Sequence, residues 1–184
     1  MQPLTAIGLA WGAWVASWAV AALWVNRTVA KPGVGEEVGS RLIVGLGAAL
    51  LFWGFSQSPA FSGLIGWLLF AVVVGGVLFA WWARLHIGRL WSGRVTRKEN
   101  HRVVNTGPYA LVRHPIYTGI ILSASATGLA ERRWLALLGA AIIAAGFWLR
   151  SRLEERFLSA ELGPAYEAYA RDIPMLIPFF FRKR

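Results

Sequence analysis

Apolar runs long enough to cross a bilayer alternate with short polar breaks in the first half of the chain. A membrane-spanning helix needs about 20 mostly apolar residues, and residues 4–25 meet this requirement without a charge. This run has no basic stretch before it and no convincing small-residue cleavage site, so we interpret it as an anchor rather than a signal peptide. Two further runs, residues 42–55 and 61–82, follow a polar segment that ends at Arg41. The pattern predicts three spans, the second of them short.

The second half of the chain has a different pattern. Residues 83–115 are polar and strongly basic, and we expect them to form a loop. Two shorter apolar runs follow, 116–130 and 134–149, separated by only three residues. So short a break suits a tight helical hairpin, here over residues 116–149. From residue 150 to 184 the chain is mostly polar, and an amphipathic continuation is expected there.

These elements predict an all-α integral membrane protein with about five transmembrane helices. Residues 1–75 would carry the first three spans, and residues 76–184 a core whose loop and C-terminal amphipathic helices close a pocket. Five crossings place 17 of the 19 basic residues on one side, all except Arg132 and Arg133. Basic residues favour the cytoplasmic side of a membrane. The loop, the C-terminus and the pocket are therefore expected in the cytoplasm, and the N-terminus outside.

Composition agrees with the hydropathy pattern. The chain is 57% hydrophobic and 15% charged, with 11 Trp and no Cys, whereas soluble domains carry about 25% charged residues. This excludes a disordered chain, a disulfide-stapled secreted domain and an ordinary soluble enzyme. Topology and attraction to anionic lipids account for most of the net charge of +10. Nucleic-acid binding is not expected, since it needs a basic face on a soluble fold.

Polar residues with special backbone properties gather in the cytoplasmic loop, which holds all three His. Gly107-Pro108 is a turn signal. Pro115 is expected to open the fourth span, which places His114 at a helix N-terminus at the membrane face. Open N–H groups at such a terminus suit a carboxylate or phosphate. Gly119 leaves room for a flat ligand or a neighbouring helix.

A second polar cluster begins at Arg150. Glu154 lies four residues further on, hence on the same helical face, while Glu155 is turned about 100° away. Gly163-Pro164 should end this helix, and Tyr166 and Tyr169 should share one side of the next. The same residues also allow a plain structural interpretation, with His114 as an interfacial polar group and Arg150–Glu154 as a surface ion pair. No metal-ligand spacing or phosphate-binding glycine loop is present. The residues alone thus indicate a membrane protein with a polar cytoplasmic site.

From about Gly76 to its end the chain resembles the isoprenylcysteine carboxyl methyltransferase family, which is related to phospholipid methyltransferases. The matching stretches are residues 87–92, 101–109, 113–119, Glu154-Glu155, Gly163, Tyr166, Tyr169 and Pro174. The resemblance implies an integral membrane enzyme that uses S-adenosylmethionine. Its reaction would be most like carboxyl O-methylation of an isoprenylcysteine-type substrate.

The resemblance also implies roles for individual residues. The cofactor pocket would be formed by His101, Arg102, Val103, Val104, Tyr109, His114, Pro115, Ile116, Tyr117 and Glu154. Arg150 falls at the arginine that holds the methyl acceptor. A carboxylate acceptor needs only this positioning cation, whereas an amine or thiol would have to lose a proton, to Glu155 or His114. No metal is expected.

The acceptor itself stays open at this stage. A lipophilic acceptor would arrive laterally from the bilayer, with membrane lipids as neighbours. The short, Cys-free format suggests a prokaryotic inner membrane, where prenylated proteins are not expected. A phospholipid amine or small-thiol methyltransferase is therefore an alternative. An NADPH-dependent enzyme of sterol-reductase type and a non-catalytic membrane subunit are further ones.

Overall fold

The computed structural model describes residues 1–21, 28–30, 34–57, 59–88, 91, 97–98 and 103–179. Six α-helices account for most of these residues: α1 Pro3–Ala21, α2 Val34–Phe52, α3 Gly63–Ile87, α4 Pro115–Glu131, α5 Trp134–Leu162 and α6 Pro164–Asp172. Two short 3₁₀ turns, η1 Phe55–Gln57 and η3 Gly107–Ala110, lie between them. The predicted hairpin is thus confirmed, with α4 beginning at Pro115 and α5 ending before Gly163.

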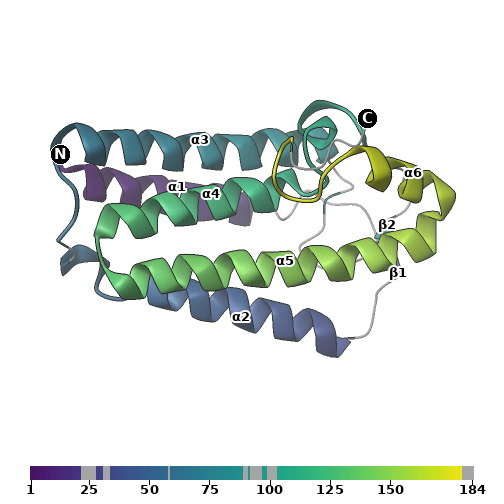
Figure 1. Ribbon diagram of the computed structural model, residues 1–184, viewed down its shortest axis with the longest axis horizontal. Helices are drawn as coiled ribbons and strands as arrows, with labels where there is room; N and C mark the ends of the chain where they lie inside the picture. Colours follow the sequence, from purple (N-terminus) through teal and green to yellow (C-terminus); the bar gives the residue numbers. More distant parts are fainter. Residues whose placement is uncertain are drawn as a thin grey trace.

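The first five helices form an elongated bundle in which consecutive helices run in opposite directions (Figure 1). In it, α3 packs against α1 and α4, and α5 packs against α2 and α4. The N-terminus and the α4–α5 turn lie at one end of the bundle (Figure 1). Helix α6 and the segment after it lie at the other, which we call the site end. A two-stranded antiparallel ribbon, β1 Thr28–Ala30 with β2 Arg97–Lys98, is an addition that the sequence did not predict.

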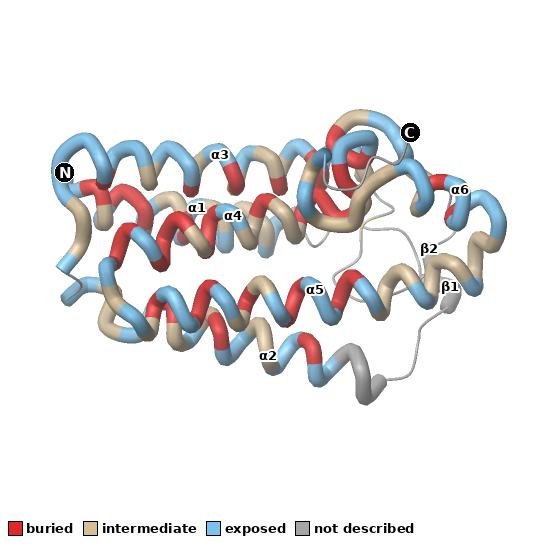
Figure 2. The backbone as a smooth tube through the Cα atoms, in the orientation of Figure 1, coloured by how far each residue is buried: buried red, intermediate tan, exposed pale blue. Residues whose placement is uncertain are grey.

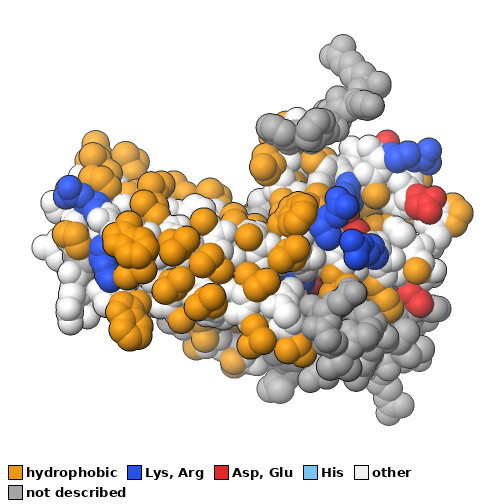
Figure 3. Space-filling model, turned by 60° about the horizontal axis from the view of Figure 1, so that its bottom comes forward, with side chains coloured by type: hydrophobic (Ala, Val, Ile, Leu, Met, Phe, Trp, Pro, Cys, Tyr) orange, Lys and Arg blue, Asp and Glu red, His pale blue; other side chains and the backbone are white. Residues whose placement is uncertain are grey.

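Four of the described helices are long and apolar enough to cross a membrane: α1, α2 with the turn that follows it, α3 and α5. Helix α4 is shorter, with 17 residues. The predicted count of about five spans therefore stays a prediction, while the all-helical membrane architecture is confirmed. On the face shown in Figure 3, hydrophobic side chains cover the length of the helices and charged side chains gather at the two ends.

Small residues let the helices approach closely. A Cβ added to Gly76 of α3 would lie 2.5 Å from the carbonyl oxygen of Gly119 in α4. Helix association in membranes favours such small residues, because lipid supplies no hydrophobic drive between helices. Gly119 therefore makes room for a neighbouring helix rather than for a flat ligand. Buried residues accordingly follow the inward faces of α3, α4 and α5 (Figure 2).

Two helices extend beyond the apolar runs that predicted them. Helix α2 begins at Val34, so Arg41 lies inside a helix and not at the end of a loop. Helix α3 continues to Ile87 and includes Arg84, which is fully buried. The guanidinium of Arg84 donates hydrogen bonds to the carbonyls of Gly88 at 2.6 Å and Ala21 at 2.7 Å. A basic side chain can thus end a helix by binding its last carbonyls, which hydropathy alone does not reveal.

Candidate active site

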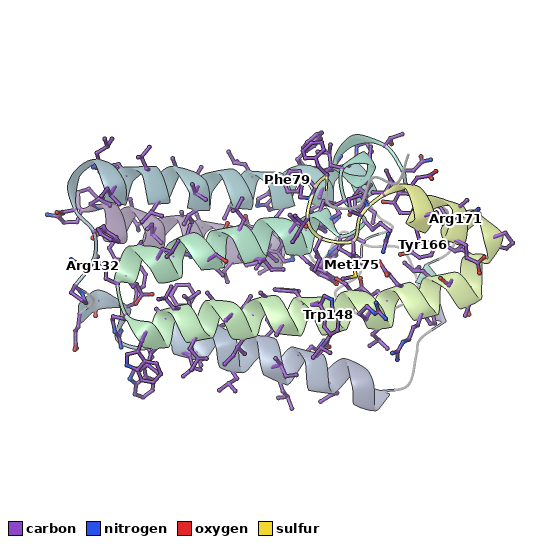
Figure 4. All side chains as sticks on the ribbon, in the orientation of Figure 1. Phe79, Arg132, Trp148, Tyr166, Arg171 and Met175 are labelled. Carbon is purple, nitrogen blue, oxygen red and sulfur yellow. The ribbon has the colours of Figure 1, made fainter. Side chains whose placement is uncertain are left out.

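The N-terminus of α4 is joined to the segment that follows α6. The backbone N–H of Arg113 donates to the carbonyl of Pro174 at 2.9 Å, and that of His114 to Met175 at 3.1 Å. The hydroxyl of Thr118 donates to the carbonyl of Leu176 at 2.7 Å. Met175 lies beside the start of α4 (Figure 4). The sequence predicted open N–H groups here, but those of Arg113 and His114 are already paired.

Two consecutive carboxylates of α5 contact the imidazole of His114. Its Nδ1 lies 3.4 Å from Oε2 of Glu154, and its Nε2 lies 3.3 Å from Oε1 of Glu155. The imidazole stacks on the ring of Tyr117 with an interplanar angle of 3°. The two clusters singled out in the sequence, residues 113–119 and 150–156, therefore lie together in space. We call the side chains that join them the ionic cluster: Arg113, His114, Tyr117, Arg150, Glu154 and Glu155.

The protonation of His114 is shifted by these neighbours. Burial alone would lower its pKa, because it disfavours the charged imidazolium. Hydrogen bonds to Glu154 and Glu155 outweigh this effect, so that the pKa of His114 is raised above its ordinary value. His114 therefore binds its proton more tightly in the folded protein than in the unfolded chain.

Arg150 and Glu154 form a buried pair, with side chains only 7% and 16% exposed. Nε of Arg150 lies 3.5 Å from Oε1 of Glu154 and donates a 2.9 Å hydrogen bond to the hydroxyl of Tyr117. That hydroxyl in turn donates to Oε1 of Glu154. The interpretation as a surface ion pair is therefore wrong. The predicted placement of Arg150 and Glu154 on one helical face is confirmed.

Arg113 is a residue to which sequence reasoning gave no role. Its Nε donates to Oε1 of Glu155 at 2.7 Å, and its Nη1 donates to the carbonyls of Ala170, at 2.6 Å, and Ile173. One guanidinium thus joins α5, the end of α6 and the start of α4. Its position directly before His114, inside the matching motif, is the signal that could have identified it.

The remaining predicted cofactor residues lie close to this cluster or outside the described residues. Tyr109 and Ile116 belong to a small buried core, against which Val104 packs. The hydroxyl of Tyr169 donates to the carbonyl of Tyr109 at 2.7 Å, which fixes the η3 turn to α6. Pro115 is the buried first residue of α4, and Val103 is half-buried. His101 and Arg102 lie outside the described residues.

A cavity of about 300 Å³ adjoins the ionic cluster. It is lined by Trp14, Trp18, Ser40, Arg41, Val44, Trp91, Ile116, Tyr117, Ile120, Phe147 and Arg150. Tyr117 and Arg150 belong to both the cavity wall and the ionic cluster. Among the described residues, no three His, Asp or Glu side chains are grouped so that they could hold a metal ion.

Comparison with known proteins places these residues in a family context. The model of the isoprenylcysteine carboxyl methyltransferase (ICMT) family matches residues 64–160, which is just over half of the chain. The matched stretch contains α4 and nearly all of α3 and α5, and with them the whole ionic cluster.

Individual relatives carry several functional names. Over 151 residues the chain is 32% identical to methanethiol S-methyltransferase 2 of Bradyrhizobium diazoefficiens, covering 73% of this chain and 56% of that protein. It is 29% identical over 87 residues to protein-S-isoprenylcysteine O-methyltransferase B of Arabidopsis thaliana, covering 47% and 44%. It is 37% identical over 98 residues to the cobalt-zinc-cadmium resistance protein CzcN of Cupriavidus metallidurans, covering 50% and 43%.

This chain spans about half the length of each of these three relatives. The names of the relatives differ, but the family match contains the helices and side chains that build the ionic cluster. On this match the chain belongs to the isoprenylcysteine carboxyl methyltransferase family.

Proposed function

We propose that this integral membrane protein transfers the methyl group of S-adenosylmethionine to a lipophilic acceptor. The observation that carries the proposal is the position of Tyr117 and Arg150. Both side chains belong to the ionic cluster and to the wall of the adjoining cavity. A donor held by the cluster and an acceptor held in the cavity would therefore meet at these two residues.

The chemistry of the cluster fits a cofactor that carries an ammonium, a carboxylate, a sulfonium and ribose hydroxyls. A carboxylate side chain has about four acceptor sites, and Glu154 has Tyr117, Arg150 and His114 as neighbours. Acceptor capacity remains on Glu154 for an ammonium or a ribose hydroxyl. His101, Arg102, Val103, Val104, Tyr109, Pro115 and Ile116 complete the proposed pocket.

S-adenosylmethionine supplies an electrophilic methyl group on a positively charged sulfur. The protein must then align the acceptor with this group and exclude water, since methyl transfer gains mostly from orientation and desolvation. Arg150 is buried, and Tyr117 and Glu154 hold its guanidinium in place. We assign it the role of positioning the acceptor carboxylate.

The surroundings of Glu155 bear on the type of acceptor. Glu155 accepts a hydrogen bond from Arg113 and lies against His114. A carboxylate with two such neighbours is a poor general base, whereas carboxylate methylation needs no base. This favours a carboxylate acceptor, with Glu155 positioning Arg113 and His114. A small thiol is the second candidate, because a relative named methanethiol S-methyltransferase 2 matches 73% of this chain.

The proposed orientation places the site end of the bundle in the cytoplasm and the N-terminus outside. A water-soluble cofactor then reaches the ionic cluster from the cytoplasm, and a lipophilic acceptor reaches the cavity from the bilayer. The catalytic core would comprise residues 76–184, preceded by the spans of residues 1–75. The basic composition of this end follows the positive-inside rule.

Ligand titration of the purified protein in nanodiscs tests the proposal. The ligands are S-adenosylmethionine, S-adenosylhomocysteine and NADPH, with binding followed by calorimetry. We expect saturable binding of the first two and none of NADPH. NADPH binding without a response to either of the other compounds would overturn the proposal in favour of a reductase.

A further inference from the structure

One side of the cavity beside the ionic cluster consists of residues to which the proposed reaction assigns no role. Its floor is formed by α4 and α5, whereas its other side is formed by α1 and α2. Toward the opposite end of the bundle, α1 and α2 contact each other through the rings of Trp11 and Phe52, which pack edge to face at 5.7 Å. Nearer the site end, their side chains line the cavity instead. On this side the cavity is therefore bounded by two helices that are predicted to span the membrane.

The α1 side of this wall is aromatic. Trp14 and Trp18 pack with ring centroids 5.1 Å apart, and Trp18 packs edge to face on Trp91 at 5.7 Å. Trp91 is held in place by the guanidinium of Arg84, 4.5 Å from its ring. Such a surface is apolar, and its rings are fixed by one another. It suits the hydrocarbon part of a ligand.

The α2 side carries a charge. Arg41 lines the cavity and is exposed, so that the cavity reaches the surface of the bundle at this residue. It lies inside the stretch of α2 that is long and apolar enough to span a membrane. Charged residues are rare in such helices because they are costly, and they commonly face the bundle interior or a cavity, where they can line a ligand path. Ser40 and Val44, the other lining residues of α2, carry no charge.

The cavity thus has the exposed Arg41 at its mouth and the buried Arg150 at its floor. The side formed by α1 is aromatic. Its volume of about 300 Å³ lies at the lower limit of ligand pockets. This is enough for a headgroup and the first part of an apolar chain, while the rest of a longer chain would stay in the bilayer.

We propose that Arg41 is a specificity-determining residue, which makes this cavity select an apolar acceptor with an anionic headgroup over a neutral one. The inference rests on the proposed function for the role of the cavity in methyl transfer. Arg41 attracts the anion and retains it near the mouth, and Arg150 holds it for reaction. A charge at the rim of a binding site acts in this way on association and selectivity.

The test compares two probes, a geranyl thioether of a short carboxylic acid and its uncharged carboxamide. Binding of each to the protein in nanodiscs is measured by calorimetry without any cofactor. We expect Arg41→Gln to weaken binding of the acid by about three- to tenfold at low salt and to leave the amide unchanged. Arg41→Lys should keep most of the affinity for the acid.

Arg152→Gln is the matched control, since it removes an equal, exposed charge from α5 outside the cavity lining. The inference is overturned if Arg41→Gln weakens the acid and the amide equally, or if Arg152→Gln matches Arg41→Gln. It is also overturned if the unaltered protein binds the two probes alike. Because these measurements omit the cofactor, they are independent of whether S-adenosylmethionine binds, which tests the proposed function separately.

Discussion

Nε of Arg150 donates a 2.9 Å hydrogen bond to the hydroxyl of Tyr117. This contact joins α5 to α4 at the point where the ionic cluster meets the cavity. Tyr117 in turn donates to Glu154 and stacks on both His114 and Phe147, the latter with ring centroids 4.7 Å apart. One phenol thus fixes the orientation of the groups to which we assign the donor and the acceptor.

Replacing Tyr117 by Phe should therefore affect catalysis more than folding. The ring and its stacking remain, but Arg150 loses an acceptor and Glu154 loses a donor. We expect a loss of about 1 kcal/mol in unfolding free energy and a fall in kcat of about tenfold or more. Thermal unfolding and a methyl-transfer assay measure the two effects. An unchanged kcat would show that the hydroxyl does not orient Arg150.

Two adjacent glycines in α3 test the close contact with α4. A Cβ at Gly76 would meet the backbone of Gly119, whereas one at Gly75 would meet nothing within 4 Å. Gly76→Ala should destabilise the protein by about 1–3 kcal/mol, since the helices must separate. Gly75→Ala should be neutral or slightly stabilising, because alanine is the better helix former. Equal effects on thermal unfolding in nanodiscs would argue against this packing.

The raised pKa of His114 predicts a pH-dependent stability. The folded protein holds this proton more tightly than the unfolded chain. The stability gained from it is fully present below the ordinary histidine pKa of about 6.5. It is lost as the pH rises through the higher pKa of the folded state.

The difference in Tm between the unaltered protein and His114→Gln should therefore be larger at pH 6 than at pH 9. The variant leaves two carboxylates without their imidazole at both values, so some destabilisation should persist at pH 9. A difference that grows with rising pH would mean that His114 is held in its neutral form.

Arg113 should hold the segment after α6 against the start of α4. Arg113→Gln removes the contacts to Glu155, Ala170 and Ile173. Hydrogen bonds to charged groups contribute about 1.5–3 kcal/mol each, so the C-terminal segment should become accessible to protease. Arg156→Gln on α5, an exposed arginine, is the control. Equal cleavage rates in the two variants would argue against an anchoring role.

Local sequence rules predicted much of this architecture. A proline after His114 opened α4, Gly163-Pro164 separated α5 from α6, and a spacing of four residues paired Arg150 with Glu154. Each of these follows from backbone geometry over a few residues. The family resemblance pointed to the same positions.

Other parts of the site depend on contacts far apart in the chain. Arg113 reaches Ala170 across 57 residues, and the cavity joins Trp14 and Arg41 to Arg150. Hydropathy treats a tryptophan or an arginine in a span only as apolar or charged. It cannot tell which helix that residue will face, so the α1 and α2 wall of the cavity became apparent only in the folded bundle.

The division of roles between Glu154 and Arg150 is the central claim, and it is tested by measuring cofactor affinity and turnover in the same variants. Purified Glu154→Gln and Arg150→Gln proteins in nanodiscs would be compared for the Kd of S-adenosylmethionine and for the rate of methyl transfer. We predict that Glu154→Gln weakens cofactor binding by about tenfold or more. Arg150→Gln should keep the affinity and lose turnover. The account would be contradicted if Arg150→Gln weakened cofactor binding while Glu154→Gln lost only turnover. An unchanged Kd in both variants would also contradict it.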